Sequence, residues 1–407
     1  MLAPRRRSLV RPPLPRRTRR LGCWPAWAIL MMGLLALLNR LNLSWEALLA
    51  PLLPQSSDLA ALAQAAYGRA DLDATIVLGQ ARLRSDPMDV ETLSLVVRAL
   101  IYRSYADVGQ EADRAAALEL TSYALSRSSF GQAIPALHAL ALHANQRPDQ
   151  ANRLALRAIE TERQNIPARL ALALSYSARG LFETALREAD KALALAEEAH
   201  QQRRSDWRVD ALRARAIVLG DLGRYAEAIQ TIDQAIALQS RLAALHFERA
   251  LYALQLGDRD SATAAYFRVI ASHPNNAKAR LRLCVLSSEL GERQAALRYC
   301  QEAVQRRHDW YEGWYQLGRE YYLGGNFAAA RDAFASCARL QVAQGVPLRQ
   351  RNMACWTLQG QSAEAIGDCD GLLSAYREFK AMRTIADLPQ AWNYPPEGPL
   401  ICQTPTP

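Results

Sequence analysis

Cysteine and histidine are the residue types in this sequence whose side chains could define a chemical site. Apart from Cys23, the cysteines fall in the last 124 residues of the 407-residue chain, at Cys284, Cys300, Cys337, Cys355, Cys369 and Cys402. Their even number favours disulfide pairing in an oxidising compartment, whereas cysteines that replace alanine at small packed positions would remain thiols. Both interpretations are open at this point.

None of the sequence patterns that mark a catalytic, nucleotide or metal site is present. The chain has no glycine-rich phosphate loop, no dinucleotide fingerprint, no H-E-x-x-H and no C-x-x-C. The six histidines are scattered, and His138 and His143 are five residues apart, which is off the i, i+4 spacing that places two ligands on one helix face. The sequence therefore predicts no enzyme, no cofactor and no metal site.

The positive charge of the chain is concentrated at its N-terminus. Residues 1–20 contain eight arginines and no acidic residue. The remainder holds 41 basic against 40 acidic residues, so the net charge of +9 does not indicate a nucleic-acid partner. Residues 1–20 are predicted to be a basic cytoplasmic tail.

An apolar segment follows this tail directly. Residues 21–38 carry no charge, and a helix of this length is long enough to cross a bilayer. The apolar run continues past Arg40 to residue 43. We expect a transmembrane helix over residues 21–43, in contact with the lipid bilayer, and an interfacial tether over 44–55. The flanking arginines place the N-terminus in the cytoplasm and the body outside it, at a bacterial inner membrane. A cleaved signal peptide and a buried soluble helix are the alternatives.

The body of the chain contains an internal repeat. Gly223, Gly257, Gly291 and Gly325 lie 34 residues apart, each between two stretches rich in alanine and leucine. A fixed period of this size is typical of stacked helical hairpins. The clearest copy, residues 311–344, carries in order Trp314, Leu317, Gly318, Tyr321, Gly325, Phe327, Ala330 and Phe334. This copy is similar to the tetratricopeptide repeat, whose W-x2-L-G-x2-Y…A-x3-F pattern it matches at nearly every position.

The resemblance implies an all-α fold, a right-handed α-α superhelix of about nine helical hairpins over residues 56–386. Two hairpins exceed 34 residues, one by about eight residues around 104–110 and one by nine, with a polar stretch at 197–206. Cys284 and Cys300 would face each other across one hairpin, where a disulfide can join them. The proline-rich residues 387–407 are predicted to be a disordered tail.

Arrays of this family form a concave surface that holds extended peptides or partner helices. Projection of the outward positions gives the candidate groove residues Arg213, Phe247, Leu251, Lys278, Leu281, Arg282, Tyr315, Arg319 and Tyr322. Cations interleaved with aromatic side chains would suit an acidic or C-terminal peptide. Lys278 and Arg282 also resemble the last basic pair of the carboxylate clamp of chaperone-binding members, although Ile217 and Glu248 stand where that clamp has asparagines.

Taken together, these features predict a membrane-anchored scaffold that binds protein or peptide partners and no nucleic acid. Two alternatives stay open. One is a non-catalytic accessory subunit of an envelope glycan polymerase or transferase, or of another membrane enzyme complex. The other is a regulator whose array faces the cytoplasm.

Overall fold

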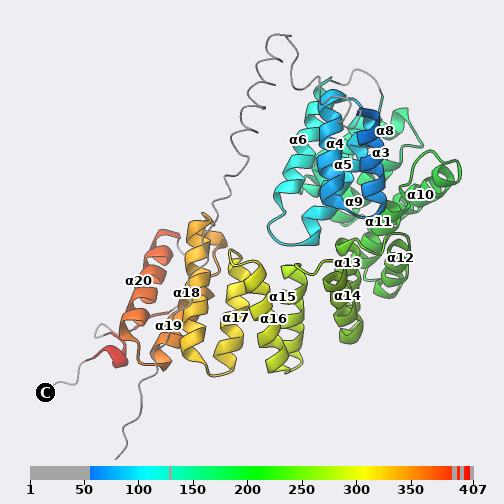
Figure 1. Cartoon of the computed structure of the whole chain (residues 1–407). Coiled ribbons are helices and arrows are strands. Elements are labelled where there is room, and N and C mark those ends of the chain that lie inside the picture. Colours follow the sequence, from blue (N-terminus) through cyan, green and yellow to red (C-terminus); the bar gives the residue numbers. More distant parts are fainter. Residues whose placement is uncertain (1–55, 128–130, 387–391, 395–397, 404–407) are drawn as a thin grey trace, which may run out of the picture. The chain divides into compact units, whose positions relative to one another are not determined.

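The computed structural model describes residues 56–127, 131–386, 392–394 and 398–403. All of them belong to one compact unit, Ser56–Pro407. They form eighteen α-helices and two short 3-10 helices, without a strand in these ranges, so the expected all-α repeat solenoid is confirmed for them (Figure 1). The predicted basic tail, transmembrane helix and tether lie outside the described residues. No helix within the described ranges is long and apolar enough to span a membrane.

The helices pair in chain order into nine hairpins, and the second helix of each hairpin packs against the first helix of the next. The pairs are α3 (Ser56–Gly68) with α4 (Leu72–Ser85), α5 (Val90–Ala106) with α6 (Ala112–Arg127), α7 (Ala133–Ala144) with α8 (Pro148–Thr161), α9 (Ile166–Ala178) with α10 (Phe182–Gln201), α11 (Arg208–Asp221) with α12 (Tyr225–Leu238), α13 (Ala243–Gln255) with α14 (Arg259–Ser272), α15 (Ala277–Glu289) with α16 (Arg293–Arg306), α17 (Tyr311–Leu323) with α18 (Phe327–Ala343), and α19 (Ala354–Ala365) with α20 (Cys369–Ala386). The 3-10 helix η2 (Leu348–Gln350) precedes α19, and η3 (Leu400–Cys402) lies in the C-terminal segment.

The 34-residue spacing of the glycines has a conformational cause. Gly257, in the turn between α13 and α14, has φ +77°, in the left-handed region that favours glycine. A Cβ at Gly257 would meet no atom within 4 Å, so the requirement concerns the backbone alone. In the α3–α4 and α7–α8 turns the corresponding residues are Ala70 and Gln146, with φ 56° and 60°.

Each hairpin of the regular part packs a small residue of its first helix against its second helix. Gly318 on α17 lies so close to Phe334 on α18 that an added Cβ would be 2.7 Å from the ring. One repeat earlier, at the same two positions, Cys284 on α15 is disulfide-bonded to Cys300 on α16. The disulfide therefore stands where the α17–α18 hairpin has the contact between Gly318 and the Phe334 ring.

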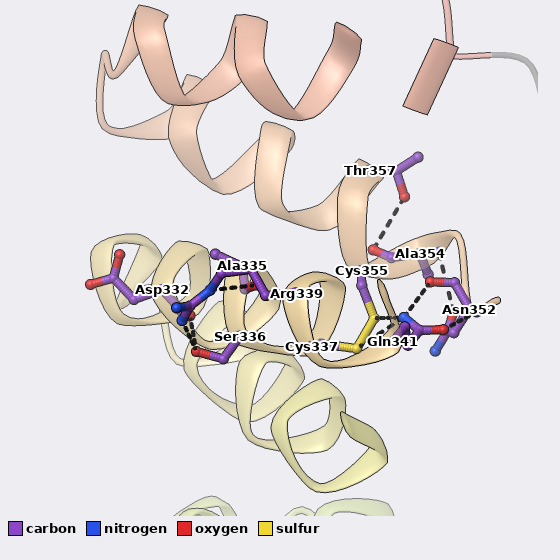
Figure 2. The surroundings of a disulfide bond; sticks show 10 residues. All are labelled: Asp332, Ala335, Ser336, Cys337, Arg339, Gln341, Asn352, Ala354, Cys355 and Thr357. Atoms are coloured by element: carbon purple, nitrogen blue, oxygen red, sulfur yellow. Dashed lines mark hydrogen bonds between the residues drawn. A yellow bond between two sulfur atoms is a disulfide. The ribbon is translucent and has the colours of Figure 1, made fainter. Parts of the chain in front are cut away.

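Two further disulfides join elements of the C-terminal hairpins. Cys337 on α18 is bonded to Cys355 on α19, and Cys369 on α20 to Cys402 in η3. Figure 2 shows the Gln341 amide beside the Cys337–Cys355 bridge, where its Oε1 accepts a hydrogen bond from Asn352 N at 2.6 Å. All six cysteines of the described ranges are thus paired.

The chain turns far enough for its second hairpin to meet its sixth and seventh. Helix α5 packs against α13, and Asp107, directly after α5, caps α15 from a distance of 170 residues in the sequence. Its two carboxylate oxygens accept hydrogen bonds from Ala277 N at 3.2 Å and Lys278 N at 3.0 Å. Asn276 Nδ2 donates to Ala106 O at 2.8 Å. The extra residues around 104–110 therefore build the contact that closes this turn.

The C-terminal segment is packed in its described parts, so the prediction of a disordered tail over 387–407 is wrong for them. The Trp392 ring lies 5.2 Å from Tyr376 and 5.3 Å from Phe379, between centroids. It also fills the space beside Gly360, where a Cβ would be 2.3 Å from the Trp392 ring. Proline excludes a helix here but not an extended segment, and the aromatic contacts with the Cys369–Cys402 disulfide hold this segment on α19 and α20.

Candidate functional site

A cavity of about 370 Å³ opens between α13, α15 and the C-terminal end of α5. Four of the nine predicted groove residues line this cavity: Phe247 and Leu251 from α13, and Lys278 and Arg282 from α15. Both pairs are spaced by four residues, so each pair shares one face of its helix. We call this the α13–α15 cavity.

The wall contributed by α13 is apolar. The Phe247 ring centroid lies 6.0 Å from that of Tyr266 on α14, which supports the ring from behind. Leu251, one turn further along α13, is 51% exposed. A partner side chain that covered Leu251 would gain roughly 25 cal/mol for each Å² of apolar surface removed from water.

Lys278 crosses the opposite wall. Its Nζ lies 4.5 Å from the centroid of the Phe247 ring and donates a hydrogen bond to Tyr105 O at 2.7 Å. Burial, reinforced by the positive charge of Arg282, lowers the pKa of Lys278 to about 8. Lys278 is therefore mostly protonated at neutral pH, close to the point at which it loses its charge.

Arg282 provides the second cation. It is exposed and forms no ion pair with any residue of the described ranges. Two carboxylates also line the cavity, Glu248 and Glu289. Because Glu248 is paired with Arg213, only Glu289 is left to balance the charges of Lys278 and Arg282. The cavity therefore combines exposed apolar surface with an excess of positive charge, an arrangement that suits a carboxylate next to an apolar side chain.

Two predicted groove residues have little exposed surface and do not line the cavity: Leu281 is buried and the Arg213 side chain is 12% exposed. The Arg213 Nη2 pairs with Glu248 Oε1 at 2.6 Å, and the guanidinium lies 5.1 Å from the ring of Tyr105 on α5. The closed turn brings α5 across α11 and encloses this arginine. Leu281 is only 7% exposed and packs in the cluster around the Cys284–Cys300 disulfide.

The remaining three predicted residues lie on α17, outside the cavity. Arg319 is exposed and lies 6.0 Å from the Tyr315 ring, while Tyr322 packs against Phe327 with ring centroids 5.3 Å apart. The structure thus separates the nine candidates into a cavity, a buried pair and a distinct surface on α17.

Tyr105, Tyr266 and Glu289 complete the α13–α15 cavity and were not predicted from the sequence. Tyr266 could have been found, because it occupies the position of Phe334 two repeats earlier. Tyr105 lies 142 residues before Phe247, and the only signal for it is the extra length around residues 104–110. No pattern points to Glu289.

The fold defines the class of protein as an α-solenoid of helical hairpins. Residues 168–242 match the family model described as the tetratrico peptide repeat. This match and the repeat geometry described above support the tetratricopeptide repeat family for the array. No curated protein matches the chain.

Several solved structures are similar to this chain at low sequence identity. A chain of the APC/C heterotetramer Cut9–Hcn1 is 16% identical with a TM-score of 0.50, over 77% of this chain and 57% of that chain. This chain thus spans little more than half the length of that relative. Yeast Tom70 is 13% identical with a TM-score of 0.45, over 81% of this chain and 78% of that chain. PilW, a type IV pilus biogenesis factor, is 19% identical with a TM-score of 0.44, over 53% of this chain and 94% of that chain. These likenesses concern the fold alone.

Proposed function

We propose that this protein is a scaffold that binds partner proteins through acidic or C-terminal segments in the α13–α15 cavity. One observation carries the proposal: the cavity presents a half-exposed Leu251 and an unpaired Arg282 on neighbouring helices. An apolar side chain of the partner would cover Leu251 and Phe247. A carboxylate beside it would pair with Arg282 and Lys278.

The partner chemistry differs from that of the carboxylate clamp. Glu248 stands where the clamp has an asparagine, and its carboxylate is already engaged by Arg213. A carboxylate cannot donate a hydrogen bond to the carboxylate of a ligand, so recognition rests on the two cations and the apolar wall. Side chains of the partner, and not only its terminal carboxylate, therefore contribute to binding.

We also propose that the scaffold is anchored in a bacterial inner membrane, with its array outside the cytoplasm. Three features support this location: the apolar residues 21–43, the eight arginines before them, and the pairing of all six cysteines in the described ranges. Disulfides persist in oxidising compartments and are rare in the cytosol.

Peptide binding to the full-length protein in detergent tests the first proposal. The probe is a fluorescein-labelled peptide of about ten residues that alternates leucine and glutamate and ends in a free carboxylate. Its neutral counterpart has glutamine for glutamate and a C-terminal amide. The acidic peptide should bind the wild type, and the variant Leu251→Ala/Arg282→Ala should weaken binding by at least about tenfold, as expected for a lost charge-assisted hydrogen bond plus apolar contact.

The matched control is Leu256→Ala/Arg259→Ala, which removes an exposed leucine and an exposed arginine outside the cavity. This control should bind the acidic peptide like the wild type. Equal losses in both double variants, or equal binding of the acidic and neutral peptides, would contradict the proposed site.

Topology reporters test the location. Alkaline phosphatase fused after Pro407 should be active in the membrane fraction, and a fluorescent protein that matures only in the cytosol should stay dark at the same position. Fluorescence without phosphatase activity would place the array in the cytoplasm and refute the proposed orientation.

A further inference from the structure

A second cavity, of about 860 Å³, lies within the first five hairpins. It is bounded by α3, by the first half of α5, by the N-terminal ends of α7, α9 and α11, by the C-terminal ends of α10 and α12, and by the segment between α10 and α11. Its volume is within the range of ligand sites in proteins. It shares no residue with the α13–α15 cavity. We call it the N-terminal cavity.

The floor of the N-terminal cavity is aromatic and electrically balanced. The Arg98 guanidinium lies 4.7 Å from the ring centroid of Tyr67 and 4.2 Å from that of Trp207. Its charge is compensated by Asp210, and its Nη2 also donates to Asp206 O at 2.9 Å. The charge of Arg98 is therefore compensated within the protein, although its Nε donates to no atom of the described ranges.

Two polar atoms at this floor are buried without a hydrogen-bond partner in the described ranges, the Tyr67 hydroxyl oxygen and Arg98 Nε. Tyr67 is 7% exposed. Burying a hydroxyl that has no hydrogen-bond partner is unfavourable, so an occupant that supplied a partner for it would be favoured.

The rim carries an excess of negative charge. Glu91, Glu162 and Glu198 are exposed, and no cation pairs with them in the described ranges. The other two carboxylates of the lining are engaged, Asp89 by Arg82 and Asp206 by Arg208. Three arginines line the cavity, and two of them, Arg98 and Arg208, are paired with aspartates. Among these lining residues, Arg204 is thus the one cation without an ion pair. Three carboxylates therefore stand against a single unpaired arginine.

We infer that the N-terminal cavity is a second docking site, which takes a basic amphipathic segment of a partner protein. Its lysines or arginines would meet Glu91, Glu162 and Glu198, while its apolar side chains would lie against Leu238, which is 43% exposed, and the partly exposed Leu195 of the cavity wall. The array would then hold two segments of opposite charge, one in each cavity. The inference rests on the proposed scaffold function, but the two sites use different residues and either can fail alone.

Binding of a basic probe to the full-length protein tests this inference. The probe is the leucine–glutamate peptide described above with lysine in place of every glutamate and a C-terminal amide. It should bind the wild type, and binding should weaken with added salt. The variant Glu91→Gln/Glu162→Gln/Glu198→Gln should weaken binding by about tenfold, since it removes three exposed ion pairs with the peptide. Binding of the acidic peptide should not change.

The control Glu119→Gln/Glu160→Gln/Glu183→Gln removes the same number of exposed carboxylates outside both cavities. It should leave the affinity for the basic peptide unchanged. A benzophenone on the peptide should crosslink within the segments that line the cavity, residues 60–68, 89–98, 133–137, 162–167, 195–209 or 238–239. Failure of the peptide to bind the wild type, equal losses in both triple variants, or crosslinks confined to other segments would overturn the inference. Loss of acidic-peptide binding alone would count only against the α13–α15 cavity.

Discussion

Arg213 on α11 and Glu248 on α13 form an ion pair that Tyr102 and Tyr105 of α5 enclose. The Arg213 side chain is 12% exposed and that of Glu248 17%, and Nη2 and Oε1 are 2.6 Å apart. The guanidinium lies 5.1 Å from both tyrosine rings. This pair therefore connects the second, fifth and sixth hairpins and stabilises the closed turn of the array.

Removing the cation of this pair should destabilise the fold strongly. Burial raises the pKa of Glu248, and Arg213 opposes that effect, so Arg213→Met leaves a buried carboxylate without its counter-charge. We expect a loss of about 3–5 kcal/mol in the free energy of unfolding, measured with urea. Arg213→Met/Glu248→Leu should recover much of this loss. The control Arg224→Met, which breaks the exposed pair with Glu227, should leave the free energy of unfolding nearly unchanged. Equal costs for the two single variants would contradict this account.

Substitutions in the turns should change stability in opposite directions. Gly257→Ala forces an alanine into a left-handed conformation without creating a clash, so it should cost about 1–2 kcal/mol. Gln146 already has this conformation without being glycine, and Gln146→Gly should stabilise the protein by up to about 1 kcal/mol. Thermal unfolding of both variants measures the effect. A stabilising alanine at position 257 would refute the conformational explanation of the repeat glycines.

Raising the pH should weaken peptide binding through Lys278 but increase the contribution of Lys278 to the stability of the fold. Its pKa of about 8 means that the charge is lost between pH 7 and 9, so the acidic peptide should bind several-fold more weakly at pH 9. The folded protein then binds fewer protons than the unfolded chain between pH 8 and 10.5, so the contribution of Lys278 to stability rises with pH in that range. Lys278→Arg keeps its charge and should remove the pH dependence of binding. An unchanged profile in this variant would assign the dependence to another group.

The C-terminal segment should protect the last hairpin. Trp392→Ala removes the ring that fills the space beside Gly360 and should destabilise α19 and α20 by about 2–4 kcal/mol. Hydrogen exchange of the amides in these two helices measures this local effect. Leu400→Ala is the control, because the Leu400 side chain is 82% exposed, and exchange should stay as in the wild type. Unchanged exchange in Trp392→Ala would mean that the segment does not stabilise the hairpin.

The repeat could be predicted because its determinants are local. A left-handed glycine and a small residue such as Gly318 act within one hairpin, so their spacing is visible along the sequence. The groove could be predicted only in part. Whether Arg213 faces solvent or a tyrosine depends on rotations that accumulate over many hairpins, and on Asp107 capping a helix 170 residues away. Leu281 follows the helical period of the groove residues, but its neighbours are set by the next hairpin.

The three disulfides lie between residues 284 and 402, while the closed turn before them depends on ion pairs and hydrogen bonds. The two parts of the array therefore differ in their response to mechanical force. Tension along the chain can unravel the hairpins of the first part residue by residue. In the second part, the segments between bonded cysteines, with separations of 16, 18 and 33 residues, cannot be extended. Under tension, the first part of the array can therefore lengthen by unfolding, whereas the disulfides limit how far the second part can lengthen.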